Sequence, residues 1–192
     1  RGVVDVAALP TVPSDARIAL WQGDITRLCA DAIVNAANSA LLGCFIPCHR
    51  CIDNAIHSVA GLQLRAECAE IMARQGHPEE TGSAQMTRGY NLPARHVLHT
   101  VGPIVSGALT DEHRALLGSC YRSCLALAAA HGLTSVAFCC ISTGEFRFPN
   151  AAAAEIAVRE VRAFLSKPSY IERVVFNVFK DEDRIIYERL LQ

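Results

Sequence analysis

The sequence lacks the features that would favour a nucleic-acid-binding, membrane or exported protein. Its 18 Lys and Arg are balanced by 19 Asp and Glu, so no excess positive charge is available to bind phosphate backbones irrespective of base sequence. No apolar run approaches the roughly 20 residues of a spanning helix, and the amino-terminal residues lack the basic-then-apolar order of a signal peptide. We therefore expect a cytoplasmic protein without a nucleic-acid or membrane partner.

A disulfide framework is also excluded, although the sequence has nine cysteines. Their number is odd, and several lie inside apolar runs such as Ala137-Phe138-Cys139-Cys140-Ile141 rather than at loop spacings. Reduced thiols are therefore expected, as in intracellular proteins.

Internal repeats, low-complexity tracts and linkers are absent from the sequence too, which favours one domain. With 192 residues, of which 51% are hydrophobic, the chain is long enough to bury one substantial core. Residues 1–16 carry Pro10 and Pro13 and are predicted to form a loosely structured lead-in, with a single domain over residues 17–192. Because the chain begins with Arg1, we expect a processed product or a fragment of a longer protein.

Strand-like and helix-like patterns alternate along the domain. The predicted strands are 17–22, 32–36, 84–88, 96–101, 135–141 and 173–179. The predicted helices are 52–73 with a break at Ala60-Gly61, 111–131, 151–166 with Asn150 as N-cap, and 181–191. This order predicts an α/β fold, a three-layer α/β/α domain with a central mixed sheet, whose ligand lies outside the carboxyl ends of the strands.

Polar residues follow several of these strands. Asn35 and Asn38 carry amides that both donate and accept hydrogen bonds, which suits sugar hydroxyls, although either Asn alone is also typical of a turn. Ser142-Thr143-Gly144 follows the strand at 135–141 and precedes a helix, so its backbone N–H groups are candidates for binding phosphate; Ser-Thr-Gly is a common turn as well.

The segment Gly43 to Cys51, called the metal loop below, is the sharpest local signal. It contains Cys44, Cys48, His49 and Cys51, and thiolate and imidazole are preferred zinc ligands. Adjacent Cys48 and His49 do not easily turn inward together, so Cys44, His49 and Cys51 are the predicted ligands, which leaves an open coordination position. Two alternatives stay open: Cys48 completes a four-ligand structural site, or these cysteines are inert core residues.

Asp53 and His57 follow this loop four residues apart and therefore share one face of the next helix. Asp53 lies near the positive helix N-terminus, where a carboxylate stays ionised and is able to position water. An ordinary first-turn charge and a packed histidine are the alternative interpretations.

Four segments in order resemble the macrodomain family in its hydrolase branch. They are Gly23-Asp24-Ile25-Thr26, Asp31-Ala32-Ile33-Val34-Asn35-Ala36-Ala37-Asn38, His99-Thr100-Val101-Gly102-Pro103 and Ile141-Ser142-Thr143-Gly144. The resemblance covers residues 17–191. Where the common branch has a glycine run ending in aspartate, this chain has the metal loop and Asp53, as in the zinc-containing branch.

The resemblance implies a site for ADP-ribose. Adenine would be bound by Asp24, the Ile25 backbone and a stacked Phe179, and the diphosphate by Ser142, Thr143, Gly144, Glu145 and Phe146. Asn38 would face the distal ribose, Asp53 would orient the attacking water, and Zn²⁺ would order that ribose.

The implied reaction is removal of mono-ADP-ribose from acidic side chains of proteins. The implied partners are ADP-ribose and mono-ADP-ribosylated proteins, among them a lipoylated carrier protein modified by a sirtuin-like transferase. The alternative is a reader module that binds ADP-ribose without cleaving it and uses zinc only to shape the loop.

Overall fold

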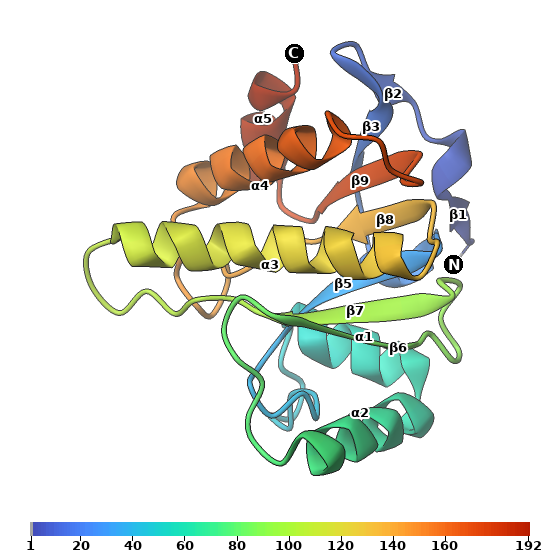
Figure 1. Ribbon diagram of the computed structural model, residues 1–192, viewed down its shortest axis with the longest axis vertical. Coiled ribbons are helices and arrows are strands. Elements are labelled where there is room, and N and C mark those ends of the chain that lie inside the picture. Colours follow the sequence, from blue (N-terminus) through green and yellow to red (C-terminus); the bar gives the residue numbers. More distant parts are fainter. Residues whose placement is uncertain (1) are drawn as a thin grey trace.

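A seven-stranded mixed sheet forms the middle layer of the protein (Figure 1), whose computed structural model describes residues 2–192. In spatial order the strands are β2 (Thr11–Val12), β3 (Asp15–Gln22), β9 (Arg173–Val178), β8 (Ser135–Phe138), β5 (Ala32–Ala37), β7 (His96–Val101) and β6 (Ala84–Arg88). The five inner strands are parallel, and β2 and β6 pair antiparallel at the two edges.

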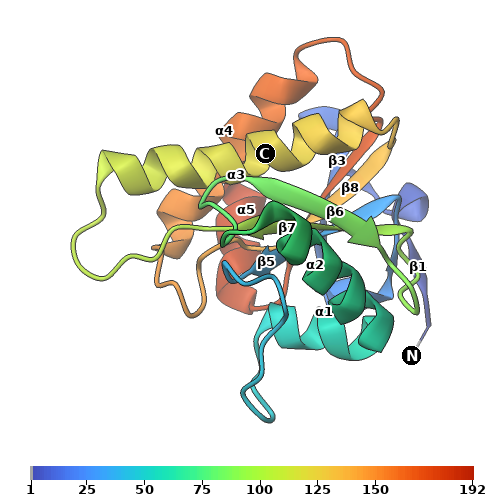
Figure 2. The same ribbon diagram turned by 60° about the horizontal axis from the view of Figure 1, so that its bottom comes forward.

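Five helices complete the predicted three-layer α/β/α fold. They are α1 (Ile52–Ala60), α2 (Leu62–Gln75), α3 (Asp111–Ala130), α4 (Asn150–Leu165) and α5 (Asp181–Leu190). Helices α3 and α4 lie on one side of the sheet and α1 and α2 on the other (Figure 2), and α5 packs against α4. No helix within residues 2–192 is both long and apolar enough to cross a membrane.

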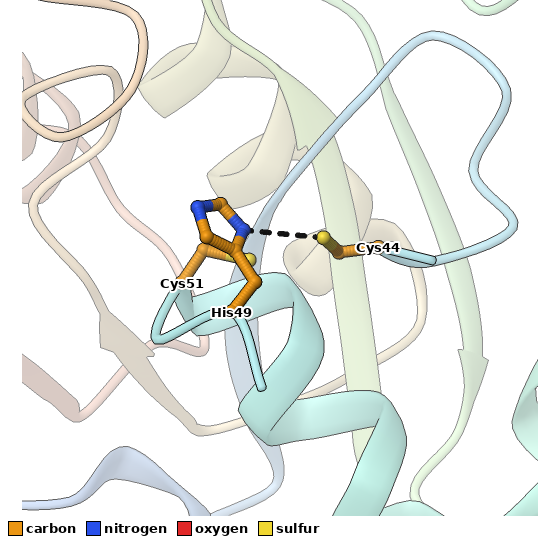
Figure 3. Close-up of side chains that lie close together, drawn as sticks. All are labelled: Cys44, His49 and Cys51. Carbon is orange, nitrogen blue, oxygen red and sulfur yellow. Dashed lines mark hydrogen bonds between the residues drawn. The ribbon is translucent and has the colours of Figure 1, made fainter. Parts of the chain in front are cut away.

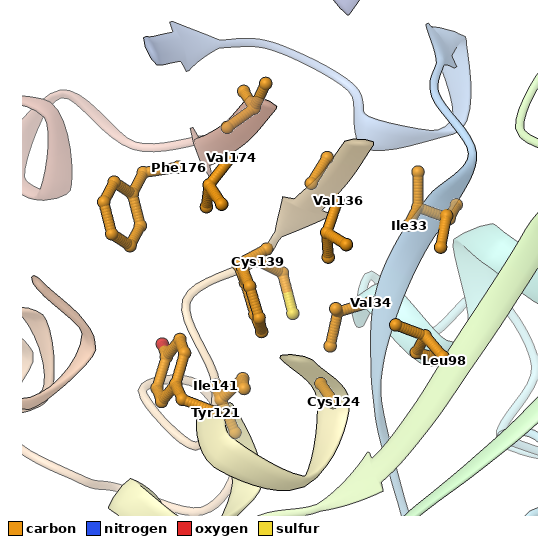
Figure 4. Close-up of a cluster of buried hydrophobic side chains, with 14 of the residues drawn as sticks. Ile33, Val34, Leu98, Tyr121, Cys124, Val136, Cys139, Ile141, Val174 and Phe176 are labelled. Carbon is orange, nitrogen blue, oxygen red and sulfur yellow. The ribbon is translucent and has the colours of Figure 1, made fainter. Parts of the chain in front are cut away.

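The core lies on the central parallel strands, because both of their faces are covered. Ile33, Val34, Val136 and Val174 are all fully buried and belong to one apolar cluster that includes residues on both faces of the sheet (Figure 4). Strands covered on both faces read as continuous apolar runs rather than as alternating patterns. That is why these segments were recognisable in the sequence.

Residues 2–16 pack on the domain, which corrects the expectation of a loosely structured lead-in. Strand β1 (Val4–Asp5) pairs with β4 (Leu28–Cys29), and β2 extends the main sheet. Val6 between them is only 4% exposed. Pairing at the sheet edges satisfies backbone hydrogen-bonding groups of the segment, and burial of Val6 anchors it to the domain. Neither effect can be recognised from the proline content of residues 2–16.

Two further expectations differ in detail from the structure. The strand predicted over 135–141 ends at Phe138, although Cys139 and Ile141 stay buried beyond it. Helix α4 begins at Asn150 itself, and the Asn150 amide donates to Asp183 Oδ1 at 2.6 Å instead of capping the helix. The predicted break is confirmed: α1 ends at Ala60, and Gly61 has a φ of +93°.

Candidate functional site

The parallel strands bring several loops to one edge of the sheet. Strands β3, β9, β8 and β5 run in the same direction, so the segments that follow them emerge together. These segments begin at Gly23, Phe179, Cys139 and Asn38. The sequence-predicted site residues in them therefore lie along one rim, as expected for ligand sites of open α/β sheets.

Asp53 is the buried carboxylate of this rim. It lies in the first turn of α1 and is 5% exposed. Asn35 Nδ2 donates to its Oδ1 at 2.8 Å, and Asn38 Nδ2 lies 3.5 Å from its Oδ2. Burial raises the pKa of Asp53, while the hydrogen bond from Asn35 and the nearby His57 and Arg65 oppose that rise.

The metal loop brings its three predicted ligands together beside Asp53. Cys44 Sγ lies 3.2 Å from His49 Nδ1 (Figure 3), and the donor atoms of Cys44, His49 and Cys51 all lie within 4.8 Å of one another. Cys48 is exposed with a φ of +56° and stays outside this group. Two thiols and an imidazole at this spacing fit zinc by the chemistry of the donor set.

Local structure fixes two of these donors. Cys51 is the N-cap of α1, and its Sγ accepts from the Asn54 N–H at 3.4 Å. The Ile46 backbone N–H lowers the pKa of the Cys44 thiol, whereas burial raises that of Cys51. Because thiols bind metals as thiolates, Cys44 is prepared for that role by its own loop.

The loop after β8 turns tightly around Ser142. The Phe148 N–H donates to the Ser142 carbonyl at 2.9 Å, and the Arg147 N–H to that of Gly144 at 3.0 Å. Ser142 has a φ of +65°, and its buried Oγ has no partner among residues 2–192. Adjacent N–H groups that turn outward in such a loop are suited to an anion.

The opposite end of the rim carries the residues predicted for adenine. Asp24 Oδ1 accepts from the Thr26 N–H at 3.1 Å and from its hydroxyl at 2.6 Å, which fixes the turn that contains Ile25. Phe179 follows β9 and is 75% exposed, so its ring is accessible for stacking. Because Gln22 pairs with Val178, the two segments emerge side by side.

Comparison with known proteins assigns the family. The sequence model of the Macro domain family matches residues 34–157. The chain belongs to the Macro domain family. It is 57% identical to a protein-ADP-ribose hydrolase of Treponema medium over 172 residues, which are 90% of this chain and 66% of that protein. A protein-ADP-ribose hydrolase of Staphylococcus aureus strain Mu50 is 52% identical over 190 residues, 98% of this chain and 71% of that protein.

A solved structure has the same fold over the whole chain. The Trypanosoma brucei macrodomain in complex with ADP-ribose has a TM-score of 0.86 and 40% sequence identity, and the match covers 100% of this chain and 78% of that one. The chain spans 66 to 71% of the length of the two bacterial relatives.

Within this macro domain, the position of Asn35 corrects one sequence expectation. Its side chain is 0% exposed and lies behind Asp53, so its amide has no access to a sugar hydroxyl. Sequence reasoning also assigned no role to His99, which lies beside Asn35 in the neighbouring strand β7. The pairing register of β5 and β7 is the signal that would have linked the two.

Arg65 is a second residue that the sequence did not point to. Its guanidinium carbon lies 4.5 Å from the centre of the Phe45 ring, which connects α2 to the tip of the metal loop. Such a cation–π contact restrains an otherwise exposed aromatic side chain.

Proposed function

We propose that this macro domain hydrolyses the bond between mono-ADP-ribose and acidic side chains of modified proteins, with Zn²⁺ in the metal loop beside the distal ribose. Two relatives at 52% and 57% identity are named protein-ADP-ribose hydrolases. A structural relative at 40% identity binds ADP-ribose. The activity, the acidic acceptor and the zinc are all part of the proposal.

The position of Asp53 is the observation that supports hydrolysis most directly. One carboxylate oxygen is fixed by Asn35, and the other lies on the side of Asn38 at the rim. A carboxylate held in this way is suited to orient a water molecule as a general base. Its charge also stabilises the oxocarbenium-like character that develops at the anomeric carbon.

The other rim residues have binding roles in this proposal. Asp24, Ile25 and Phe179 bind adenine, and Ser142 to Phe146 bind the diphosphate through the turn after β8. Asn38 donates to Gly43 O at 3.2 Å as well as lying near Asp53, so its amide is placed between the metal loop and the carboxylate. From there it orients the distal ribose.

Cys44, His49 and Cys51 are the residues that would bind the metal. Three protein ligands leave a coordination position open. When bound, a zinc ion there supplies Lewis-acid polarisation at the distal ribose. The protein residues supply placement of the substrate and the carboxylate.

The proposed substrates are mono-ADP-ribosylated proteins, and a lipoylated carrier protein modified by a sirtuin-like transferase is the specific one to test. The cytoplasm is the proposed compartment, because thiolate ligands such as Cys44 and Cys51 need a reducing environment.

A release assay tests this function. The zinc-loaded protein is incubated with an aspartate- or glutamate-linked mono-ADP-ribosylated protein, and free ADP-ribose is measured. We expect release by the wild type, and a loss of at least about 100-fold in Asp53→Asn with ADP-ribose affinity within about threefold, since the variant loses the general base and the charge that stabilises the transition state but keeps the residues that bind ADP-ribose. Asp111→Asn is the matched control, because Asp111 is an exposed first-turn aspartate on α3.

Two outcomes would contradict the proposal. Tight ADP-ribose binding without release from any linkage would make the protein a reader. Full activity of Asp53→Asn would remove the carboxylate from the chemistry.

A further inference from the structure

A chain of buried polar groups continues behind Asp53, away from the rim. Asn35 on β5 and His99 on β7 are paired in register, and both side chains are 0% exposed. The Asn35 amide nitrogen lies 2.8 Å from Asp53 Oδ1 and 3.2 Å from His99 Nδ1. One amide therefore joins the carboxylate to the imidazole.

The hydrogen-bonding roles along this chain follow from chemistry. The amide nitrogen has two hydrogens, so it is able to donate one to Asp53 and one to His99 Nδ1. Burial lowers the pKa of His99 to about 3, which keeps the ring neutral. If Nδ1 accepts from the Asn35 amide, the single ring hydrogen lies on Nε2. Nε2 lies 2.9 Å from the hydroxyl of Thr87, a buried residue of β6. Each nitrogen in the chain has a partner.

A buried metal site is the competing interpretation of this region. Donor atoms of His57, Cys68 and His99 lie within 4.8 Å of one another, and Cys68 Sγ is 3.8 Å from His99 Nε2. That arrangement would require a lone pair on Nε2, which bears the hydrogen directed at Thr87. Burial also raises the pKa of the Cys68 thiol to about 12, which disfavours a thiolate ligand. The contacts therefore favour hydrogen bonding over metal binding.

We propose that Asn35 and His99 are positioning residues, which fix the orientation of the Asp53 carboxylate through one hydrogen-bonded chain from β6 across β7 and β5 to α1. This inference rests on the proposed function of Asp53. With Oδ1 bound to Asn35, the carboxylate presents Oδ2 on the side of Asn38 and the rim. His99 acts by holding the amide of Asn35 in the orientation that donates to Asp53.

The need for His99 follows from the amide itself. The Asn35 carbonyl oxygen has no partner among residues 2–192, so only its nitrogen keeps the side chain in place. Without an acceptor at Nδ1, the amide is free to rotate and present oxygen to Asp53, which would repel the carboxylate. Buried polar networks set geometry in this way because each unmade hydrogen bond is costly.

Two variants separate positioning from packing, because the larger one, which fills more of the histidine volume, is the one that lacks the acceptor. His99→Leu removes the acceptor for Asn35, whereas His99→Asn offers a side-chain oxygen near the place of Nδ1. We expect His99→Leu to lower kcat by about 10- to 100-fold, with KM and the Kd for ADP-ribose within about threefold of the wild type. His99→Asn should recover most of that loss. Equal kcat values in the two variants, or a Kd that weakens as much as kcat falls, would overturn the proposal.

Imidazole ¹⁵N NMR provides a readout that needs no turnover. The wild type should show His99 as neutral, with hydrogen on Nε2 and an Nδ1 that accepts a hydrogen bond. Asn35→Leu should shift the Nδ1 signal toward that of an unbonded nitrogen. Hydrogen on Nδ1 in the wild type would contradict the chain, and bound zinc above one equivalent that is lost in Cys68→Ala would support the metal interpretation instead.

The two proposals fail in different ways. A wild type that releases no ADP-ribose removes the proposed function and the positioning role with it, whereas the NMR spectrum still decides whether the chain exists. Should both His99 variants unfold, Thr87→Val tests the outer link of the chain, which is the hydrogen bond between Thr87 and His99 Nε2. This variant replaces only the hydroxyl beside Nε2. A few-fold loss of kcat is expected there, and an unchanged kcat together with an unchanged Nε2 signal would exclude that link.

Discussion

His49 Nε2 lies 3.3 Å from Glu145 Oε1, so the metal loop contacts the loop after β8 through one imidazole. The other nitrogen of that ring, Nδ1, faces Cys44 Sγ at 3.2 Å. A ligating histidine commonly donates its second N–H to a carboxylate, which fixes the ring and strengthens the ligand. Glu145 is predicted from the sequence to bind the diphosphate, and its carboxylate is also placed to hold the His49 ring in the orientation that binds a metal.

Removing the Glu145 carboxylate should weaken the binding of zinc to the metal loop. We expect Glu145→Ala to weaken zinc affinity by about 10-fold, the lower end of such outer-shell effects, and Glu145→Gln to weaken it less. Competition with a chromophoric chelator measures the change. Glu155→Ala, an exposed glutamate on α4, is the control, and equal affinities in Glu145→Ala and Glu155→Ala would show that Glu145 does not support the ligand.

The ligand set itself is tested by two cysteine variants in the same loop. Cys51→Ser should lower bound zinc and ADP-ribose release together, because a hydroxyl is a much weaker zinc ligand than a thiolate. Cys48→Ser should retain about one zinc per chain, since Cys48 lies outside the donor group. Metal content by mass spectrometry is the measurement. Loss of zinc in Cys48→Ser would point to the four-ligand structural site instead.

Local patterns account for the parts of the fold and site that the sequence predicted. Gly61 marked the helix break, and the metal-loop ligands lie close together in the chain, so short spacing was enough to group them. The apolar run 135–141 indicates which residues are buried but not which of them pair with a neighbouring strand. The predicted strand was therefore too long, because β8 ends at Phe138. Asn150 suited a cap locally, but its amide binds Asp183 of a later helix.

The buried half of the site depends on long-range register. Asn35 and His99 are 64 residues apart and meet only because β5 and β7 pair in one particular alignment. A one-residue shift would turn the two side chains to opposite faces. Spacing within the sequence contains no information about that alignment, so Asn35 was predicted to contact sugar and His99 had no predicted role.

The depressed pKa of His99 predicts acid sensitivity. The unfolded chain binds this proton near the ordinary value of 6.5, whereas the folded chain binds it only near 3. Stability contributed by His99 is therefore present above 6.5 and falls between 6.5 and 3, by about 1.4 kcal/mol per pH unit for one proton.

Urea unfolding at pH 7, 6 and 5 measures this slope. His99→Asn, which does not titrate, should give a shallower loss of unfolding free energy below pH 6.5 than the wild type. His131→Asn, a substitution of an exposed histidine, should leave the slope unchanged. Identical slopes for the wild type and His99→Asn would mean that His99 is not buried in its neutral form.

Gly102 is expected to tolerate no side chain, because β7 ends against the turn after β8. A Cβ on Gly102 would collide with Ser142 Oγ and lie 2.9 Å from Ile141 Cγ2. We expect Gly102→Ala to lower unfolding stability by about 1 to 3 kcal/mol, as overpacking does, and to weaken ADP-ribose binding by displacing Ser142. Gly107→Ala is the matched control, since nothing lies within 4 Å of a Cβ there.

The double variant Gly102→Ala with Ser142→Ala separates displacement from general loss of stability. Deleting Oγ relieves the main collision and leaves the contacts with Ile141 Cγ2 and, at 3.2 Å, with the Cβ of residue 142. If the position of Ser142 governs the loop, the double variant should bind ADP-ribose more tightly than Gly102→Ala alone, as measured by calorimetry. Equal affinities would mean that the residual contacts with Ile141 and the Cβ of residue 142, rather than the seryl hydroxyl, set the cost of a side chain at this position.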